Sequence, residues 1–485
     1  MSNQLLLTYS VLDSEYKNGS VQFISGLQDA AAVTPNVGTI NNPANSGVTI
    51  KPTDPDPKMF SYAYNGTVRM LVSKVVTPVS NAAPYTSWSL YEATPTVPST
   101  GWTVLAKDIA LYTEPNKQAA TNSYGVAHVG DYLYIVDYDS QKIYALGTDE
   151  LSGLPTGSFH ELDKFLDLGA LATNPLPSTA KGQAIIALTN GSTPYLFALY
   201  TNPLDAYATQ YGSSILVRMT IDATTGATTG TPIYDAQCAL GMNSQEIIPL
   251  TETDENGDET VSLVIPSVGG QQQAGTTSNG LNSMIQSVLA FDTDIPWEPT
   301  TLVTGAASGT YDIFAISAPD RAASATEDPV VYILTYDYAA DYLTTNWKLY
   351  ETTVTTLLSM TGGTLSAAVT AGDLVSKDSA TGTPGYFWDI LMETGDTAAN
   401  DRLWFFQGSA LLVTLPTVYT PSASPNAANK FFGVGTCAGK IGGTNVDWAD
   451  LTIETVRQAA LGKSLKRSVR ASKPPAAAAA EGEEK

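Results

Sequence analysis

Asp-x-Asp pairs offer the residue types and spacing in this chain that could bind a hard cation. Asp137 and Asp139 form one pair, and Asp292 and Asp294 form another. Residues two apart in a strand project to the same side, so both carboxylates of a pair could bind one calcium ion. Each pair also falls where a strand is expected to end, and aspartate is common in such turns. We therefore treat these four residues as candidate Ca²⁺ ligands, with a structural turn as the alternative.

Residue patterns for catalysis are sparse by comparison. The two histidines, His128 and His160, form no His-x-x-His spacing, and the chain has no Cys-x-x-Cys pair. Glycoside hydrolysis would need two carboxylates beside the scissile bond, and a sialidase would add an arginine cluster and an S-x-D-x-G-x-x-W box that this sequence lacks. We expect Asp312 and Asp373 near an inner rim, although no pattern distinguishes them. The sequence thus predicts no catalytic residue, no cofactor other than calcium, and a protein that is not an enzyme.

The charge is divided between a long acidic body and a short basic tail. The chain has a formal net charge of −23, yet residues 456–485 contain seven Lys or Arg and three Asp or Glu. An acidic body repels nucleic acid and anionic lipid, so we expect neither nucleic-acid binding nor membrane insertion. We expect the tail to bind a protein partner or to support self-assembly. Its candidate binding residues are Arg457, Lys463, Lys466, Arg467, Arg470 and Lys473.

Short β-strands are the elements that must position these side chains. Residues 124–146, YGVAHVGDYLYIVDYDSQKIYAL, predict three strands that are rich in Tyr, Val and Ile and are separated by turn residues. Equivalent runs recur along most of the chain, and SWSLYEAT (87–94) and NWKLYETT (346–353) occupy the same place in two units. We expect residues 354–359 to be the fourth strand of the fifth unit and residues 365–372 to begin the sixth.

Repeated four-stranded units of this kind resemble the β-propeller superfamily, without matching a specific family such as WD or kelch propellers. At the two ends, residues 430–437 and 445–456 supply two strands and residues 4–13 and 20–27 supply two more. The resemblance implies an all-β fold of seven four-stranded antiparallel blades, the last closed by strands from both termini. Six blades is the alternative if the last segment is only a cap. The propeller would span 1–455, followed by a tail, 456–485, that is basic and then rich in Ala and Glu.

Propellers include enzymes, lectins and scaffolds, so the fold alone does not choose a function. The lack of a catalytic set and the charged tail favour a non-enzymatic structural or interaction protein, within an extracellular, cell-surface or virion assembly rather than in the cytoplasm. A carbohydrate-binding lectin is the first alternative, in which Trp88 could stack on a glycan instead of packing between blades. A propeller glycoside hydrolase is the second. We expect specificity where the repeat is interrupted, in residues 30–57, 267–283 and 319–329.

Overall fold

A computed structural model gives the backbone of most strands in this chain and the side chains of fewer positions, chiefly between residues 125 and 365. The described residues are 5–12, 19–25, 36–40, 59–64, 67–76, 83–93, 102–114, 117–118, 123–138, 142–147, 157, 159–161, 181–201, 214–229, 236–241, 244, 246–267, 283–293, 297–304, 311–338, 345–363, 365, 370–374, 387–393, 402–407, 410–414, 432–436 and 448–455. Within these ranges, no helix is long and apolar enough to cross a membrane.

The two ends of the chain share one antiparallel sheet, as the sequence predicts. Its order is β29–β1–β2–β3, formed by Trp448–Thr455, Leu5–Leu12, Gly19–Ser25 and Asn36–Ile40. Leu5 lies opposite Thr455 in the register between the first and last strands. The predicted make-up of this sheet is wrong in one strand. Strand β3, inside the interruption 30–57, takes the place expected for residues 430–437, which contain β28 (Phe432–Thr436) of a different sheet.

Residues 59–161 form a nine-stranded sheet that joins two four-stranded series. Its strands are β4 (Met59–Tyr64), β5 (Thr67–Val76), β6 (Tyr85–Ala93), β7 (Trp102–Glu114), β8 (Lys117–Gln118), β9 (Ser123–Val129), β10 (Tyr132–Asp137), β11 (Ile143–Gly147) and β12 (Phe159–Glu161). The series β4–β7 and β9–β12 are each antiparallel. They meet where β12 pairs parallel with β7, Phe159 lying opposite Leu111. This junction was not predicted.

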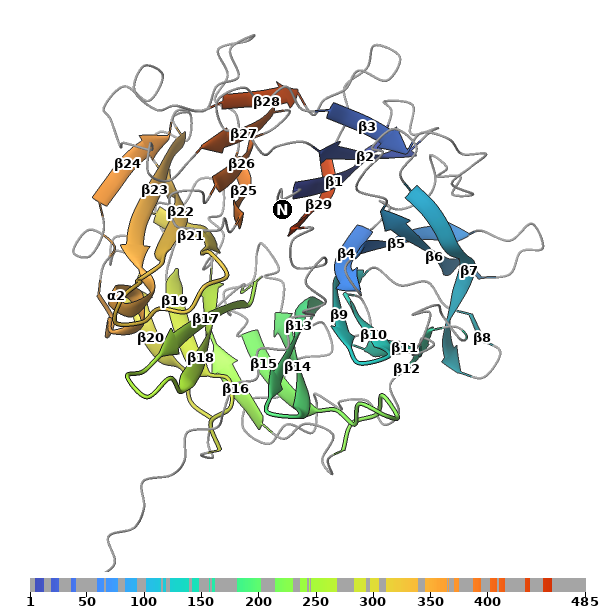
Figure 1. Ribbon diagram of the computed structural model, residues 1–485, viewed down its shortest axis with the longest axis horizontal. Helices are drawn as coiled ribbons and strands as arrows, with labels where there is room; N and C mark the ends of the chain where they lie inside the picture. The colour runs from blue at the N-terminus through green and yellow to red at the C-terminus, as the bar shows by residue number, and fades with distance from the viewer. Residues whose placement is uncertain are drawn as a thin grey trace, which may run out of the picture.

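Four further sheets have four antiparallel strands each, in sequence order. They are β13 (Lys181–Asn190), β14 (Thr193–Thr201), β15 (Ser214–Thr220) and β16 (Ala236–Leu240); β17 (Ile248–Thr253), β18 (Glu259–Ser267), β19 (Met284–Leu289) and β20 (Thr300–Thr304); β21 (Tyr311–Ser317), β22 (Val330–Tyr338), β23 (Thr345–Thr353) and β24 (Thr370–Leu374); and β25 (Phe387–Glu393), β26 (Arg402–Gln407), β27 (Ala410–Thr414) and β28 (Phe432–Thr436). Figure 1 shows the sheets arranged around a common centre, with β13, β17, β21 and β25 toward it. The chain is an all-β protein with the β-propeller fold.

The prediction that residues 354–359 form a strand is wrong. They contain the short helix α2 (Val354–Leu358), and the fourth strand of that sheet is β24. The Thr353 side chain caps the helix by accepting a hydrogen bond from the Thr356 amide. Val354 and Leu357, three residues apart on one helical face, are buried. The prediction that residues 365–372 begin the next unit is also wrong. The strand in this region, β24, is the last strand of the β21–β24 sheet, and the next sheet begins at β25.

The apolar core lies between neighbouring sheets rather than within one layer. Alternate residues of β14 show this: Leu196 and Ala198 pack toward the β9–β11 strands, whereas Phe197 and Leu199 pack toward the β17–β20 sheet. All four are fully buried. Both faces of the sheet are therefore apolar, and each such leucine contributes about 1.5–3 kcal/mol by burial. Trp88 is also fully buried, between the β4–β7 and β9–β11 strands, which excludes it as a glycan platform.

Tight hairpins set the register of the inner strands. Gly130 has φ of 55° between Val129 and Tyr132, and Gly191 has φ of 62° between Asn190 and Thr193. Side chains rarely adopt such positive φ values, so glycine allows two-residue turns at these positions. The first turn, Gly130-Asp131, separates two of the strands predicted within residues 124–146. The second turn is Gly191-Ser192.

Candidate functional site

The segment between β21 and β22, residues 318–329, folds back over the inner strand of the neighbouring sheet. The Ala323 amide donates to the Thr251 carbonyl at 2.8 Å, and the Thr253 amide donates to the Ala323 carbonyl at 2.6 Å. Ala323 and Glu252 form a parallel bridge, and the Ala323 side chain is buried. This pairing fixes the interrupting segment, which the sequence marked as a place for specificity, against β17.

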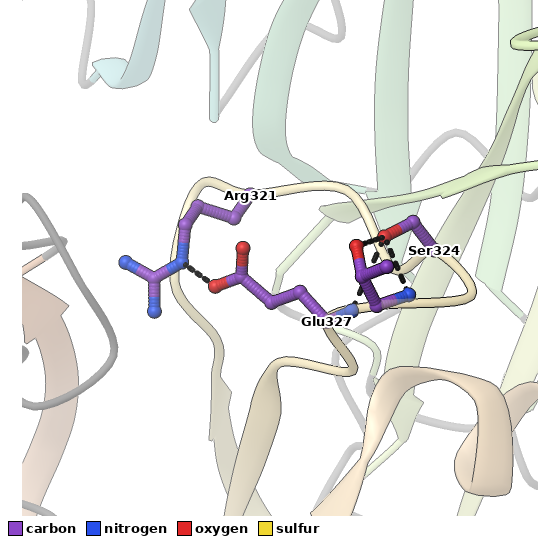
Figure 2. Close-up of polar contacts among 4 residues, drawn as sticks. Arg321, Ser324 and Glu327 are labelled. Carbon is purple, nitrogen blue, oxygen red and sulfur yellow. Dashed lines mark hydrogen bonds and ion pairs between the residues drawn. The ribbon is translucent and has the colours of Figure 1, made fainter.

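Polar contacts within the segment give it a defined shape (Figure 2). The Arg321 Nε atom lies 2.6 Å from Glu327 Oε1. Ser324 Oγ accepts a hydrogen bond from the Glu327 amide at 3.2 Å. The Glu327 side chain is 42% exposed, so the ion pair contributes at most about 1 kcal/mol. The contacts therefore act mainly by orienting the loop, including Asp328, which directly follows Glu327.

Two carboxyl groups from neighbouring sheets meet beside this loop. Burial raises the pKa of Glu252 on β17 above its ordinary value, and the carboxylate of Asp328 raises it further. Asp328 Oδ1 accepts a hydrogen bond from the Thr355 amide at 3.0 Å, which fixes its carboxylate against the start of α2. The pKa of one acid is thus raised, while its neighbour is an anchored hydrogen-bond acceptor. Such a difference between two nearby acids suits proton donation by one and charge stabilisation by the other.

A third acid provides a contrast on the same sheets. Glu351 on β23 lies opposite Tyr332, and burial raises its pKa also. Unlike Glu252, its shift has no contribution from a neighbouring carboxylate. Both acids are partly buried, so the neighbouring Asp328 carboxylate is what distinguishes Glu252 from Glu351.

The predicted calcium ligands fall at separate places in the fold. Asp137 ends β10 and is 2% exposed. Asp292 follows β19, and its carbonyl accepts a hydrogen bond from Arg218 Nη1 at 2.7 Å. Asp139 and Asp294 lie outside the described residues. Within the described part of the chain, His, Cys, Asp and Glu side chains form no group of three suited to a metal ion. The paired arrangement predicted for each site stays a prediction.

His128 is on an inner strand, β9, opposite Leu133. Burial lowers its pKa to about 4, a hydrogen bond with the Gly130 backbone and the Asp131 carboxylate oppose this, and the Arg69 charge adds to it. Its imidazole is therefore neutral at neutral pH and gains a proton only in acid. A proton shuttle near pH 7 needs a pKa close to that pH, so His128 does not suit the role.

Other predicted residues lie at the edges of the fold or beyond the described residues. Asp373 is on β24, the strand of its sheet that is furthest from the inner strand β21, so the prediction of an inner-rim acid is wrong there. Asp312 does lie on β21. The tail residues Arg457, Lys463, Lys466, Arg467, Arg470 and Lys473 lie outside the described residues. Of the cysteines, Cys238 is a buried free thiol whose pKa burial raises to about 12, which makes it unreactive.

Known proteins resemble the chain in structure only. No family model and no curated protein matches it. It is similar to a GH32 β-fructofuranosidase from Bombyx mori, with 9% identity and a TM-score of 0.34 over 93% of this chain and 87% of that one. It is also similar to a sucrose-6-phosphate hydrolase from Lactobacillus gasseri (12% identity, TM-score 0.32, 83% and 89% covered) and to an exo-1,5-α-L-arabinanase from a bovine ruminal metagenomic library (13%, 0.29, 61% and 92%). At these identities the likeness concerns the fold alone.

The prediction of a non-enzymatic structural or interaction protein is withdrawn. The similar solved structures named above are enzymes, which contradicts it. The acid pair of Glu252 and Asp328 is also a feature that the sequence did not reveal. The predicted role as a component of a cell-surface or virion assembly loses its basis at the same time. No local signal marks the pair, since the two acids meet only when residues 318–329 cross β17.

Proposed function

We propose that this chain is a seven-bladed β-propeller that cleaves glycosidic bonds. The count of seven is supported by the four-strand series that begin at the inner strands β29, β4, β9, β13, β17, β21 and β25. The reaction is supported by one observation above all: the raised pKa of Glu252 beside the Asp328 carboxylate. Glycoside hydrolysis uses two carboxyl groups in different protonation states, one on each side of the bond that breaks.

In this proposal Glu252 is the general acid. Its protonated carboxyl group donates a proton to the oxygen of the leaving sugar as the glycosidic bond breaks. Asp328, fixed by the Thr355 amide and by the loop that Arg321 and Glu327 shape, carries the negative charge that faces the developing positive charge of the sugar ring. It would act either as the nucleophile or as the base that activates water, and the configuration of the product distinguishes these two roles.

The test compares E252Q and D328N with the matched control E351Q. A panel of aryl glycosides, β-fructofuranosides and 1,5-α-L-arabinan is incubated with each protein, and reducing sugar is measured. We expect E252Q and D328N to lower kcat about 100-fold or more, because each removes one proton-transfer or charge-stabilising group, whereas E351Q retains the wild-type rate. The proposal fails if the wild type cleaves none of the panel, or if E252Q is as active as E351Q.

The basic tail and the location of the chain remain separate proposals. We propose that Arg457, Lys463 and the other tail cations bind an acidic protein surface, supported by their opposite charge to the body. A chain lacking residues 457–485 should then lose partner binding or self-assembly in light scattering, and unchanged assembly would contradict the idea. The propeller domain is proposed to span 1–455, and work outside the cell stays a prediction.

A further inference from the structure

Two short backbone bridges join the β17–β20 sheet to segments that connect strands of the β21–β24 sheet. At the outer edge Val303 pairs with Gly363, and at the inner edge Glu252 pairs with Ala323; both bridges are parallel. The outer bridge lies among uncharged residues on both of its segments, TTLVT and MTGGT. The inner bridge differs from it in one respect that can respond to pH, because a carboxylic acid occupies the paired position of the strand.

The loop 318–329 is attached firmly at its ends and weakly in the middle. Near its two ends lie Pro319 and Pro329, and both prolines are buried. The Val354 amide donates to the Pro329 carbonyl at 3.0 Å, which ties this end to the start of α2. In the middle, the amide and the carbonyl of Ala323 each make one hydrogen bond with β17. Two hydrogen bonds are a small part of the stability of a fold, so the middle of the loop can open while both ends stay attached.

The direction of the Glu252 side chain follows from its neighbours. Residues two apart in a strand project to the same side, and Leu250 is buried in the apolar cluster between the β17–β20 and β21–β24 sheets. Paired residues also project to the same side, and Ala323, the partner of Glu252, lies in that cluster together with Val354 and Leu357 of α2. Glu252 is half-buried. Its carboxyl group therefore lies at the margin of the cluster, on the side of the sheet where the loop and α2 pack.

The charged groups of the described elements around Glu252 are mostly acidic. The loop carries Asp320, Arg321, Glu327 and Asp328, the turn after β17 carries Asp254, Glu255, Asp258 and Glu259, and α2 carries none. Arg321 is paired with Glu327, so the cation of the loop is already neutralised within it. On the adjoining strands, the uncharged Thr260 lies opposite Glu252, and Tyr350 is the titratable residue of β23 that packs in the cluster. The surroundings therefore oppose a negative charge on Glu252.

We infer that the loop 318–329 is a pH-sensitive cover, whose middle part lies on β17 while Glu252 is protonated and separates from β17 when Glu252 is ionised. Burial raises the pKa of Glu252 above its ordinary value, and the Asp328 carboxylate raises it further. Opening admits water to the carboxylate, so the pKa of Glu252 is lower in the open form. The closed form is fully favoured below that lower pKa, and it loses this advantage as pH rises through the higher pKa of the closed form.

The coupling between Glu252 and the loop involves only groups of the protein, so it does not depend on the chain being an enzyme. Its consequence for catalysis does rest on the proposed function. In that function Glu252 is the general acid, and the proton that it donates is also the proton that keeps the loop closed. Loss of activity at rising pH and opening of the loop should therefore share one midpoint.

Hydrogen exchange tests the coupling, because the Ala323 and Thr253 amides are the donors of the inner bridge. The full chain is exchanged at a series of pH values from about 4 to 8, and each rate is corrected for the intrinsic rate at that pH. The Thr304 amide, which donates to the Gly363 carbonyl in the outer bridge, is the internal reference. We expect protection at Ala323 and Thr253 to fall several-fold relative to Thr304 as pH rises, since one unit of pKa difference between two forms corresponds to about a tenfold change in their ratio.

Two variants separate the charge of Glu252 from its size. E252Q keeps the size of the side chain and removes its titration, so protection of the inner bridge should no longer change with pH. E351Q is the matched control, because Glu351 is also partly buried but lies opposite Tyr332 on β23 and not at the bridge. It should retain the pH dependence of the wild type.

D328N gives a second arm that leaves Glu252 in place. Asparagine can still accept the Thr355 amide through its Oδ1, so the loop stays anchored while the neighbouring negative charge is lost. The fall in protection should then be smaller than in the wild type and have a lower midpoint. The inference is overturned if wild-type protection does not change with pH relative to Thr304, or if E252Q or D328N has the wild-type profile. A pH-dependent cover on a chain that cleaves no glycoside would overturn the proposed function and support this inference.

Discussion

Two neighbouring contacts between sheets are held together by different means. The β13–β16 sheet meets the β17–β20 sheet through side chains: Phe197, Phe291 and Trp297 cluster there with Arg218. The β17–β20 sheet meets the β21–β24 sheet through the backbone as well as through apolar side chains, because segments of the latter pair with strands of the former. The stability of the side-chain contact depends on a few side chains, whereas the stability of the backbone contact depends on the conformation of the paired segments.

The backbone contact acts at both edges of one sheet. At the inner edge, Ala323 bridges to β17. At the outer edge, the Thr304 amide donates to the Gly363 carbonyl at 2.9 Å, and the Gly363 amide donates to the Leu302 carbonyl at 3.1 Å. The β17–β20 sheet is thereby held on two sides by its successor. This arrangement gives the acid pair a fixed support, since Glu252 belongs to one sheet and Asp328 to the other.

The substitution with the largest expected effect on stability is R218A, which breaks the side-chain contact. The residue is 7% exposed, its Nη1 donates to the Ala290 carbonyl at 3.1 Å and to the Asp292 carbonyl at 2.7 Å, and its guanidinium lies 5.2 Å from the Trp297 ring centroid. R218A should lower the free energy of unfolding by about 4 kcal/mol, because it removes charged hydrogen bonds and a cation–π contact. Urea unfolding measures this, and R218K should recover only part of it. A loss below about 0.5 kcal/mol would show that the contact does not depend on Arg218.

The second largest expected effect is a loss of stability at low pH, which we assign to His128 at the contact between the β4–β7 and β9–β12 strands. Burial lowers the pKa of His128 from 6.5 to about 4, so the folded state disfavours its protonation. Its contribution to stability is complete above pH 6.5 and is lost as pH falls toward 4, by at most about 3 kcal/mol. Glu252 and Glu351 act in the opposite direction, because their pKa values are raised. Their contribution is complete below their unfolded pKa and is lost as pH rises through the folded value.

Urea unfolding of H128Q at a series of pH values isolates the histidine. The variant should lose less stability than the wild type between pH 6.5 and 4, since glutamine does not titrate. E351Q should alter the profile only where Glu351 titrates. Parallel profiles for H128Q and the wild type over that interval would contradict the assignment.

A proline in place of Ala323 tests the backbone contact between the loop 318–329 and β17. A323P removes the amide that donates to the Thr251 carbonyl, and the loss should cost about 2 kcal/mol, felt mainly by residues 318–329. Limited proteolysis of this segment and hydrogen exchange at Thr253 measure the local opening. The pKa of Glu252 should also fall toward its ordinary value as the loop releases it. A325P, at an exposed position of the same loop, is the control. Equal proteolysis of both variants would show that the bridge does not hold the loop.

The smallest effect compares equivalent hydroxyls at the two contacts. Ser214 Oγ accepts the Ser244 amide at one contact, and Ser283 Oγ accepts the Ile313 amide at the other. S214A and S283A should each cost about 1–2 kcal/mol, because each leaves a buried amide without its partner. Similar values in thermal unfolding would mean that this hydroxyl link is common to both contacts. A loss at only one of them would restrict it to that contact.

The sequence predicted the local elements well and the contacts between units poorly. Residues 124–146 form β9, β10 and β11 as expected, since turns at Gly130-Asp131 and alternating apolar residues are local signals. The pairing of the two ends was also predicted, because unused strands remained at each. The segment 354–359 was mistaken for a strand because valine and threonine favour strands. Its cap by Thr353 and the packing of its apolar face against the preceding β17–β20 sheet favour a helix instead.

The acid pair could not be predicted for a related reason. Glu252 is the second-last residue of the inner strand β17 and Asp328 lies in a polar loop, so neither carries a distinguishing neighbour in the sequence. Only the pairing of Ala323 with Thr251 and Thr253 brings them together. Asp137, by contrast, was singled out for its spacing to Asp139. The structure places Asp137 at the buried end of β10, whereas Asp139 lies outside the described residues.

The pairing of β1 with β29 makes the order of events in folding depend on two strands that are more than 400 residues apart, Leu5 lying opposite Thr455. Each of the other sheets can form from residues that are close in the sequence, but the sheet that contains Leu5 cannot be completed until Thr455 is present. Closure of so long a loop is the slow, entropically costly step, and until it occurs an unpaired strand edge is exposed to other chains. A circular permutant opened at the Gly191-Ser192 turn would make this closure local and move the long-range step to the β13–β14 hairpin.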